Sequence, residues 1–228
     1  MLLPVLLRFT RSANRLDMKS NPGCQVNSLV KITPYGWQAA LIDCQAKEVA
    51  GVSAVCLESG LFTEVVPAEC TVLVCWSEKV ALTKIEELAK AAKSHVSVNQ
   101  SRLVEIPVTY NGQDLAEVAQ LTGLSINEVI ELHSGTIFEA TFAGFAPGFM
   151  YCTGLPDILK LPRRLTPRIN VPAGSLAIAD SYTAIYPLNS PGGWHLLGTT
   201  LSKMFDMHAS QPSLLLPGDQ VKFLPVQT

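Results

Sequence analysis

The pattern of apolar and polar residues changes in character a little beyond the middle of the chain. Between residues 35 and 134, short apolar runs alternate with segments whose apolar residues recur at helical spacing. From residue 136 to residue 228, short apolar runs are separated by Gly and Pro turns, and no segment has the spacing of a long helix. This change predicts an α+β protein, with an α/β unit followed by a smaller β-barrel or sandwich.

The first unit shows the β-α-β-β-α-β order of a ferredoxin-like fold. Its predicted elements are, in chain order, a strand at 39–43, a helix at 47–59 ended by Gly60, strands at 63–67 and 71–76, a helix at 80–93 and a strand at 104–108. Pro107 lacks a backbone donor, so we expect the last strand at a sheet edge. Glu86 and Lys90 predict an i,i+4 ion pair on the exposed face of the second helix.

Two shorter helices follow, and they connect the two units. The first spans 114–122 and ends at Gly123, and the second begins at a capping box formed by Ser125 and Glu128. The second helix runs to His133, where a histidine complements the helix dipole, so we expect this side chain at the surface.

These segments predict a division of the chain into four parts. They are a poorly ordered extension at 1–28, a ferredoxin-like α/β domain at 29–110, a helical connector at 111–135 and a β-barrel domain at 136–228. Within the last part, the predicted strands are the apolar runs at 137–142, 175–179, 184–186, 196–197 and 220–224.

Composition narrows the class of protein. The 228 residues are 48% hydrophobic and 16% charged, enough apolar surface for a packed core. Lys and Arg total 17 against 19 Asp and Glu, which disfavours a nucleic-acid partner. No apolar run approaches the roughly 18–20 residues of a membrane span, and the run after Met1 lacks the flanks of a secretory signal. We therefore expect a cytoplasmic protein, with Met18 as an alternative start to Met1.

Cysteines and histidines predict no metal site in this chain. Six cysteines occur without any Cys-x-x-Cys pair, and the four histidines do not complete a zinc-ligand spacing. Most of the cysteines lie in apolar segments, so we expect reduced thiols in a core.

The candidate chemistry lies in turn-rich segments of the second half, where Pro and Gly stiffen the chain. Arg163, Arg164 and Arg168 share one such segment, and guanidinium groups bind carboxylate or phosphate bidentately. We predict Arg163 and Arg168 as substrate or phosphate ligands. Further candidates are the amides of Gly192 and Gly193 as an anion nest, His133 and His195 as proton carriers, and the aromatic side chains Phe145, Phe149, Tyr151, Tyr186 and Trp194 as pocket walls. From the residues alone, an alternative is a set of barrel corners with a solvated arginine face.

The order of these segments resembles a known family, which includes the B subunit of bacterial 5-oxoprolinase, allophanate hydrolase subunit 1 and a sporulation kinase inhibitor. The resemblance covers residues 30 to 226, and its motifs are Gly144-Phe-x-Pro-Gly-Phe-x-Tyr151, Gly154-Leu-Pro156, Pro162-Arg163, Pro167-Arg168, Val171-Pro-Ala-Gly-Ser175, Tyr186-Pro187, Ser190-Pro-Gly-Gly-Trp194, Phe205-Asp206 and Pro217-Gly-Asp219. It implies a cyclophilin-like C-terminal barrel. It also implies a chain inactive alone, which joins a homologous C-type barrel subunit and a third, A-type subunit in an ATP-dependent 5-oxoprolinase that opens 5-oxoproline to glutamate.

Two other functions are compatible with the same resemblance. One is a protein-binding inhibitor of a sensor histidine kinase, which needs no acid–base group. The other is half of a biotin-dependent carboxyltransferase of the urea carboxylase and allophanate pathway, although Met18-Lys19 is followed by Ser20 and forms no biotinyl motif. The chain departs from the family pattern at Ala184, where glycine is usual, and at Thr199, where arginine is usual.

Overall fold

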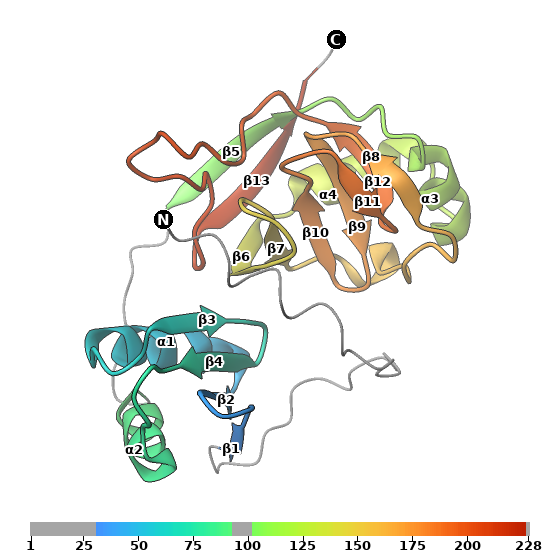
Figure 1. Cartoon of the computed structure of the whole chain (residues 1–228). Helices are drawn as coiled ribbons and strands as arrows, with labels where there is room; N and C mark the ends of the chain where they lie inside the picture. The colour runs from blue at the N-terminus through green and yellow to red at the C-terminus, as the bar shows by residue number, and fades with distance from the viewer. Residues whose placement is uncertain (1–30, 93–101, 227–228) are drawn as a thin grey trace.

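The computed structural model describes residues 31–92 and 102–226, and these form an α+β fold with two main sheets (Figure 1). One sheet has four strands and the other has seven, and a third pair of short strands lies beside the second. Each main sheet has a hydrophobic cluster of its own. The predicted succession of an α/β region and a barrel-like β region is confirmed.

The four-stranded sheet is antiparallel throughout, with the strand order β1-β2-β4-β3. Its elements are β1 (Lys31–Pro34), β2 (Ala39–Asp43), α1 (Val49–Glu58), β3 (Glu64–Pro67), β4 (Thr71–Cys75) and α2 (Leu82–Ala92), with a short 3-10 turn, η1 (Ala46–Glu48), before α1. Alternate residues of the central strands, such as Ile42 and Val74, are fully buried with Ile85 and Ala89 of α2. The predicted Glu86–Lys90 ion pair is present at 2.6 Å.

One predicted strand belongs to the other sheet. The pattern places residues 104–108 in the four-stranded sheet, but β5 (Leu103–Val108) pairs in parallel with β13 (Gln220–Pro225) in the seven-stranded sheet. Its predicted edge position is confirmed, because β5 is the last strand of that sheet. Beside β2 lies β1 instead, which belongs to the same hairpin and therefore pairs at a small cost in loop entropy.

The seven-stranded sheet curls into a nearly closed barrel with the order β12-β9-β10-β7-β6-β13-β5. Its other strands are β6 (Phe138–Ala143), β7 (Met150–Thr153), β9 (Ser175–Ala179), β10 (Tyr182–Ile185) and β12 (His195–Thr199). Thr109, after β5, and Thr199, in β12, exchange two backbone hydrogen bonds of 2.8 Å, so the first and last strands meet. Gly198 permits this contact, because a Cβ there would lie 2.4 Å from the Thr109 carbonyl oxygen.

Two helices pack against the barrel, α3 (Leu115–Thr122) and α4 (Ile126–Gly135). α4 contacts β13, and α3 contacts β12 and α4, so Val118 and Val129 join the barrel core. Gly123 ends α3 in the left-handed conformation, at φ +71°. The predicted capping box is confirmed, since the side chains and amides of Ser125 and Glu128 bond reciprocally.

His133 lies in the core, and the predicted surface position is wrong. The last turns of α4 face β13, so the ring is fully buried and stacks on Phe223 with 5.1 Å between centroids. Its Nδ1 lies 2.9 Å from the Tyr110 hydroxyl, and its Nε2 lies 3.0 Å from Thr183 Oγ1. Burial lowers the pKa of this imidazole to about 3. His133 is therefore a neutral core residue.

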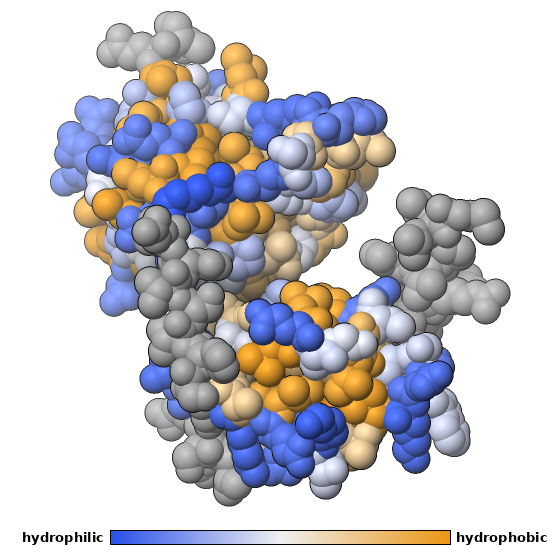
Figure 2. Space-filling view, turned by 90° about the vertical axis from the view of Figure 1, so that its left-hand side faces the viewer, coloured by the Kyte–Doolittle hydropathy of each residue, from blue (hydrophilic) through white to orange (hydrophobic). Residues whose placement is uncertain are grey.

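Within 31–92 and 102–226, no helix is long and apolar enough to span a membrane, and no group of three or more His, Cys, Asp or Glu side chains could hold a metal ion. Cys56, Cys75 and Cys152 are free thiols, as expected. Cys70 is disulfide-bonded, so the expectation of a reduced thiol is wrong at this position. Figure 2 shows that hydrophobic residues also reach the surface among hydrophilic ones. Leu57 of α1 and Val66 of β3 are among the exposed apolar residues of the described chain.

Candidate functional site

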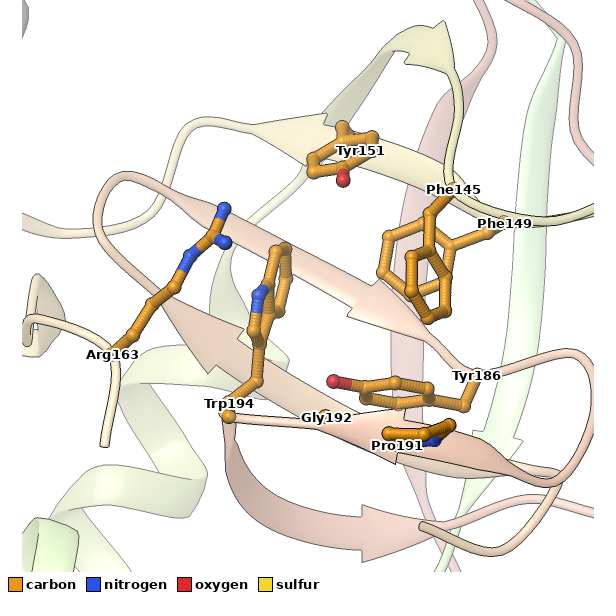
Figure 3. A pocket seen from close by; sticks show the side chains of 9 residues that line it. Phe145, Phe149, Tyr151, Arg163, Tyr186, Pro191, Gly192 and Trp194 are labelled. Atoms are coloured by element: carbon orange, nitrogen blue, oxygen red, sulfur yellow. The ribbon is translucent and has the colours of Figure 1, made fainter. Parts of the chain in front are cut away.

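Three of the turn-rich segments meet at one pocket of about 80 Å³ beside the barrel (Figure 3). The turn between β6 and β7, with the start of β7, supplies three aromatic side chains, and the loop before β8 (Arg168–Val171) supplies Arg163. The segment around β11 (Ser190–Gly192) supplies the remaining wall. The lining residues are Phe145, Phe149, Tyr151, Arg163, Tyr186, Pro191, Gly192, Gly193 and Trp194. All five predicted aromatic residues, Arg163 and both predicted glycines are thus brought together.

The aromatic walls pack edge to face, so their positions are mutually restrained. The Phe149 ring lies 5.3 Å from Tyr186 and 5.6 Å from Trp194 between centroids, at interplanar angles of 80° and 84°. Tyr151 continues the wall, at 5.6 Å from Trp194. Phe149, Tyr186 and Trp194 are each at most 5% exposed. This part of the pocket is therefore preformed.

Phe145 differs from the other aromatic residues in both exposure and backbone conformation. Its side chain is 60% exposed, and its φ is +66°. A bulky residue in the left-handed region is unusual and costs about 1–3 kcal/mol where the surroundings enforce it. The ring contacts Phe149 and Tyr186 edge to face, at 5.1 and 6.0 Å. A strained aromatic residue thus forms the outer edge of the pocket.

Arg163 is the cation of the pocket. Its guanidinium lies near Trp194 and Tyr151, and its side chain is 49% exposed (Figure 3). In the part of the chain that the structure describes, its one ion-pair partner is Asp180, with 3.5 Å between Nε and Oδ2. Burial raises the pKa of the Tyr151 hydroxyl, and the positive charge of Arg163 lowers that pKa in part. An anion entering the pocket would therefore meet a guanidinium whose Nη1 and Nη2 have no ion-pair partner among the described residues.

The glycine corner of the pocket is formed by close backbone contacts. A Cβ on Gly192 would lie 2.2 Å from the Tyr186 hydroxyl oxygen, so only glycine fits beside this buried ring. Burial raises the pKa of Tyr186, and an amide hydrogen bond from Trp194 lowers it in part. The Gly193 carbonyl accepts from the Arg164 amide at 2.8 Å, while the Gly193 amide makes no backbone hydrogen bond within the described residues.

Arg164 and Arg168 lie outside the pocket lining. Both bind the buried carboxylate of Asp114, at 3.0 and 2.5 Å, and Arg164 also contacts Glu117. The structure therefore corrects the grouping of Arg168 with Arg163: the Arg168 guanidinium is occupied by an internal ion pair. A direct role of Arg168 in binding a ligand stays a prediction, and its contacts favour a structural role.

Neither predicted proton carrier lines the pocket. His133 lies in the barrel core, with both ring nitrogens bonded to side chains there. His195 in β12 is 4% exposed, and its Nε2 lies 3.0 Å from the Pro162 carbonyl oxygen. Both rings are buried outside the pocket lining, so the structure does not bring them together with the pocket residues.

The two departures from the family pattern also lie outside the pocket lining. Thr199 is exposed at the end of β12, and its hydroxyl donates to the Asn111 side chain at 2.9 Å. Ala184 is buried in β10. Neither substitution therefore removes a side chain from the pocket of this chain.

Sequence reasoning missed Pro191, which lines the pocket, and Asp114, which binds the neighbouring arginines. Pro191 belongs to the Ser-Pro-Gly-Gly-Trp motif, so the motif itself points to it. Asp114 is interpreted in the sequence only as the start of a helix. No local spacing connects it with an arginine 54 positions later.

The sequence and the fold of this chain are similar to those of known proteins. Residues 30–215 match the carboxyltransferase domain, subdomains C and D, and the chain belongs to this family. Among curated proteins, the chain is similar to the B subunit of 5-oxoprolinase from Escherichia coli O157:H7, at 46% identity over 159 residues, which are 68% of this chain and 73% of that protein. The corresponding B subunit from Haemophilus influenzae is 45% identical over 149 residues, covering 64% of this chain and 69% of that protein. The predicted family resemblance is confirmed.

Solved structures agree with this relation. The crystal structure of TTHA0988 has a TM-score of 0.75 and 34% identity, over 84% of this chain and 40% of that chain. This chain thus spans less than half the length of that protein. A conserved protein from Pyrococcus horikoshii, PH0987, has a TM-score of 0.54 and 35% identity, over 86% of this chain and 97% of that chain. The urea amidolyase of Kluyveromyces lactis, with 17% identity and a TM-score of 0.66, shares the fold.

Proposed function

We propose that this chain is the B subunit of an ATP-dependent 5-oxoprolinase and that its pocket binds the carboxylate of 5-oxoproline through Arg163. The relation to B subunits of 5-oxoprolinase supports the choice of reaction. The observation that carries the choice of site is the juxtaposition of the Arg163 guanidinium with rigid aromatic walls; among the described residues, its one ion pair is the 3.5 Å contact with Asp180. A carboxylate would pair with the guanidinium, and a small ring would pack against the aromatic walls.

The substrate explains why both features are needed. 5-Oxoproline is a five-membered lactam with a carboxylate, and amide resonance makes direct attack by water slow. Phosphorylation of the lactam oxygen by ATP produces an activated imidate, which water opens to glutamate with loss of phosphate. Before that step, the ring must be held with its lactam oxygen toward the phosphoryl donor. Arg163 would hold the opposite, carboxylate side, and the Gly193 amide is a neutral donor nearby.

The remaining chemistry is assigned to other chains of the complex. A pocket of about 80 Å³ is small beside the roughly 300–1,000 Å³ of pockets that enclose larger ligands, which favours a small ring over a whole ATP molecule as its occupant. His133 and His195 are withdrawn from the pocket, and among the described residues no imidazole lines it. We therefore place ATP and the acid–base groups on the homologous C-type barrel chain or on the A-type chain, and expect this chain to be inactive alone.

The loops around the pocket suit a protein partner. Phe145 is 60% exposed, and Leu165 and Ile169, on either side of Arg168, are 102% and 92% exposed. Apolar side chains at the edge of a binding site are typical of surfaces that a second protein chain covers. Burial of these side chains would also keep bulk water from the pocket until the lactam oxygen is phosphorylated.

The decisive experiment reconstitutes the assembly. The chain is co-expressed with the C-type and A-type proteins, and ATP-dependent release of glutamate from 5-oxoproline is measured. Arg163→Gln removes one charged hydrogen-bonding partner, worth about 1.5–3 kcal/mol, so kcat/KM should fall by roughly 10- to 150-fold. Lys160→Gln is the matched control, since Lys160 is a nearby cation paired with Asp157 and outside the pocket lining.

Two results would contradict the proposal. A complete, folded assembly that releases no glutamate would refute the reaction, and equal effects of the two substitutions would refute the role of Arg163. Inhibition of sensor-kinase autophosphorylation by the chain alone would favour the inhibitor function. Carboxyl transfer from carboxybiotin by the assembly would favour the carboxyltransferase function.

A further inference from the structure

We infer that Asp114 is a positioning residue for the pocket: its buried carboxylate joins α3, β12 and the arginine loop (residues 163–168), so that Arg163 faces the aromatic walls. This inference rests on the proposed function of the pocket and adds a residue that lies outside it. Asp114 itself is not among the pocket-lining residues, so it acts through others.

The contacts of Asp114 connect three separate segments. Its Oδ1 accepts from Arg164 Nη1 at 3.0 Å and from Arg168 Nη2 at 2.5 Å, and its Oδ2 accepts from the Leu196 amide at 2.7 Å. The Asp114 amide donates in return to the Leu196 carbonyl at 3.1 Å. One side chain, 3% exposed, thus holds α3 against β12 and the arginine loop against both.

The usual role of an aspartate at this position does not account for these contacts. Asp114 occupies the N-cap of α3, where a carboxylate commonly accepts from amides of the first turn. Its side chain makes no such capping bond. Both carboxylate oxygens are directed to groups far away in the sequence.

The arginine loop is connected in turn to the pocket. The Arg164 amide donates to the Gly193 carbonyl at 2.8 Å, and Arg168 in β8 is the register partner of Gly192 in β11. Arg163 is adjacent to Arg164 in the chain, and its one ion pair within the described residues is the 3.5 Å contact with Asp180. The direction of its guanidinium therefore depends on the loop that Asp114 holds.

The cluster is not arranged for stability alone. Within the described residues, Nε of Arg164 and Nη1 of Arg168 are buried without a hydrogen-bond partner. Unpaired buried donors are costly, and replacing a buried ion pair by apolar side chains is often neutral or stabilising. We infer that the cluster instead holds the arginine loop in one conformation.

The experiment compares two ligands of the assembled enzyme. 5-Oxoproline carries a carboxylate, and 2-pyrrolidone is the same lactam ring without it. Binding is followed by the 19F resonance of Trp194 in protein labelled with 5-fluorotryptophan, assigned with Trp194→Phe. The preference is the ratio of the affinity for 5-oxoproline to the affinity for 2-pyrrolidone. Arg163→Gln removes the cation and should bring this ratio close to 1. We expect Asp114→Asn to reduce the same preference at least tenfold, while affinity for 2-pyrrolidone changes by less than threefold.

Further variants keep the test independent of folding. If Asp114→Asn does not fold, Arg168→Lys is used, because it keeps the charge but loses the planar geometry of the guanidinium. We expect it to lower the preference in the same direction. Asp157→Asn is the control, since Asp157 is an exposed carboxylate paired with Lys160 and outside these contacts. It should leave both affinities unchanged.

The outcomes are distinguishable from failure of the proposed function. Equal weakening of both ligands by Asp114→Asn would overturn the inference, because a purely structural role affects the whole pocket. A crystal structure of the folded variant (Asp114→Asn, or Arg168→Lys where the first does not fold) decides the inference even if the wild-type assembly binds neither ligand. An unchanged arginine loop and Arg163 there would overturn it, and a displaced loop would support it. Absence of wild-type binding would refute only the proposed ligand.

Discussion

The packing of Gly192 against Tyr186 allows a sharp test of the pocket geometry. In Gly192→Ala, the new Cβ would lie 2.2 Å from the Tyr186 hydroxyl oxygen and 2.7 Å from Cζ. Ordinary contacts of a Cβ begin near 3.4 Å, so the ring must move by about 1 Å. Tyr186 is only 2% exposed and packs edge to face on Phe149, so its displacement disturbs the adjoining wall.

The neighbouring glycine provides a matched control. In Gly193→Ala, the nearest atoms to the new Cβ lie at 3.7 Å, which is an ordinary contact. Both substitutions reduce the entropy of the unfolded chain in the same way, by about 0.4–1 kcal/mol, so this contribution cancels in the comparison. The remaining difference is the cost of overpacking, typically about 1–3 kcal/mol.

The assay is urea unfolding followed by the 19F resonance of Trp194, which reports on the pocket side of the barrel. We expect Gly192→Ala to be less stable than Gly193→Ala by about 1–3 kcal/mol, a factor of roughly 5–150 in the folding equilibrium. The native Trp194 resonance should also shift in Gly192→Ala alone. Equal midpoints and slopes for the two variants would refute the close contact between Gly192 and Tyr186.

Two further predictions concern strain and burial. Phe145→Gly should be more stable than Phe145→Ala by about 1 kcal/mol in thermal or chemical unfolding, because glycine alone adopts φ +66° without penalty; alanine being equal or better would contradict the strained conformation. The pKa of His133 is about 3 when folded against an ordinary 6.5, so the unfolded chain binds the proton more readily. The contribution of neutral His133 to the free energy of unfolding should be fully present above pH 6.5. It should fall as the pH decreases from 6.5 to 3, by up to about 1.4 kcal/mol per pH unit. His133→Gln should flatten this slope and the exposed His208→Gln should not, and identical slopes in all three proteins would exclude His133 as the cause.

Much of the local structure could be predicted because its causes lie within a few residues. Helix ends followed from Gly60 and Gly123, and the start of α4 from the Ser125–Glu128 box. The pocket walls could be predicted because aromatic residues, glycines and prolines occur together in turns that present them to one side. β7, β8 and β11 were not predicted, because these strands are only three or four residues long and lie within turn-rich sequence.

Long-range partners could not be predicted in the same way. The strand at residues 103–108 has a clear β pattern, but nothing in its side chains states whether β2 or β13 will pair with it. The pairing of Asp114 with Arg168 joins residues 54 positions apart, and neither residue type distinguishes an internal ion pair from a ligand contact. His133 has the position of a surface cap, and only the packing of α4 on β13 buries it.

The sequence by itself determined the type and ends of most helices and strands, the succession of an α/β region and a barrel, and the residues that could form an aromatic, cationic pocket. It did so because periodicity, capping and turn formation act over a few residues of backbone. Only the tertiary structure decided which arginine faces that pocket, which are held by Asp114, and which histidine is sealed in the core. Those outcomes depend on closure of the barrel, where segments more than 80 residues apart, such as those of Thr109 and Thr199, come into contact.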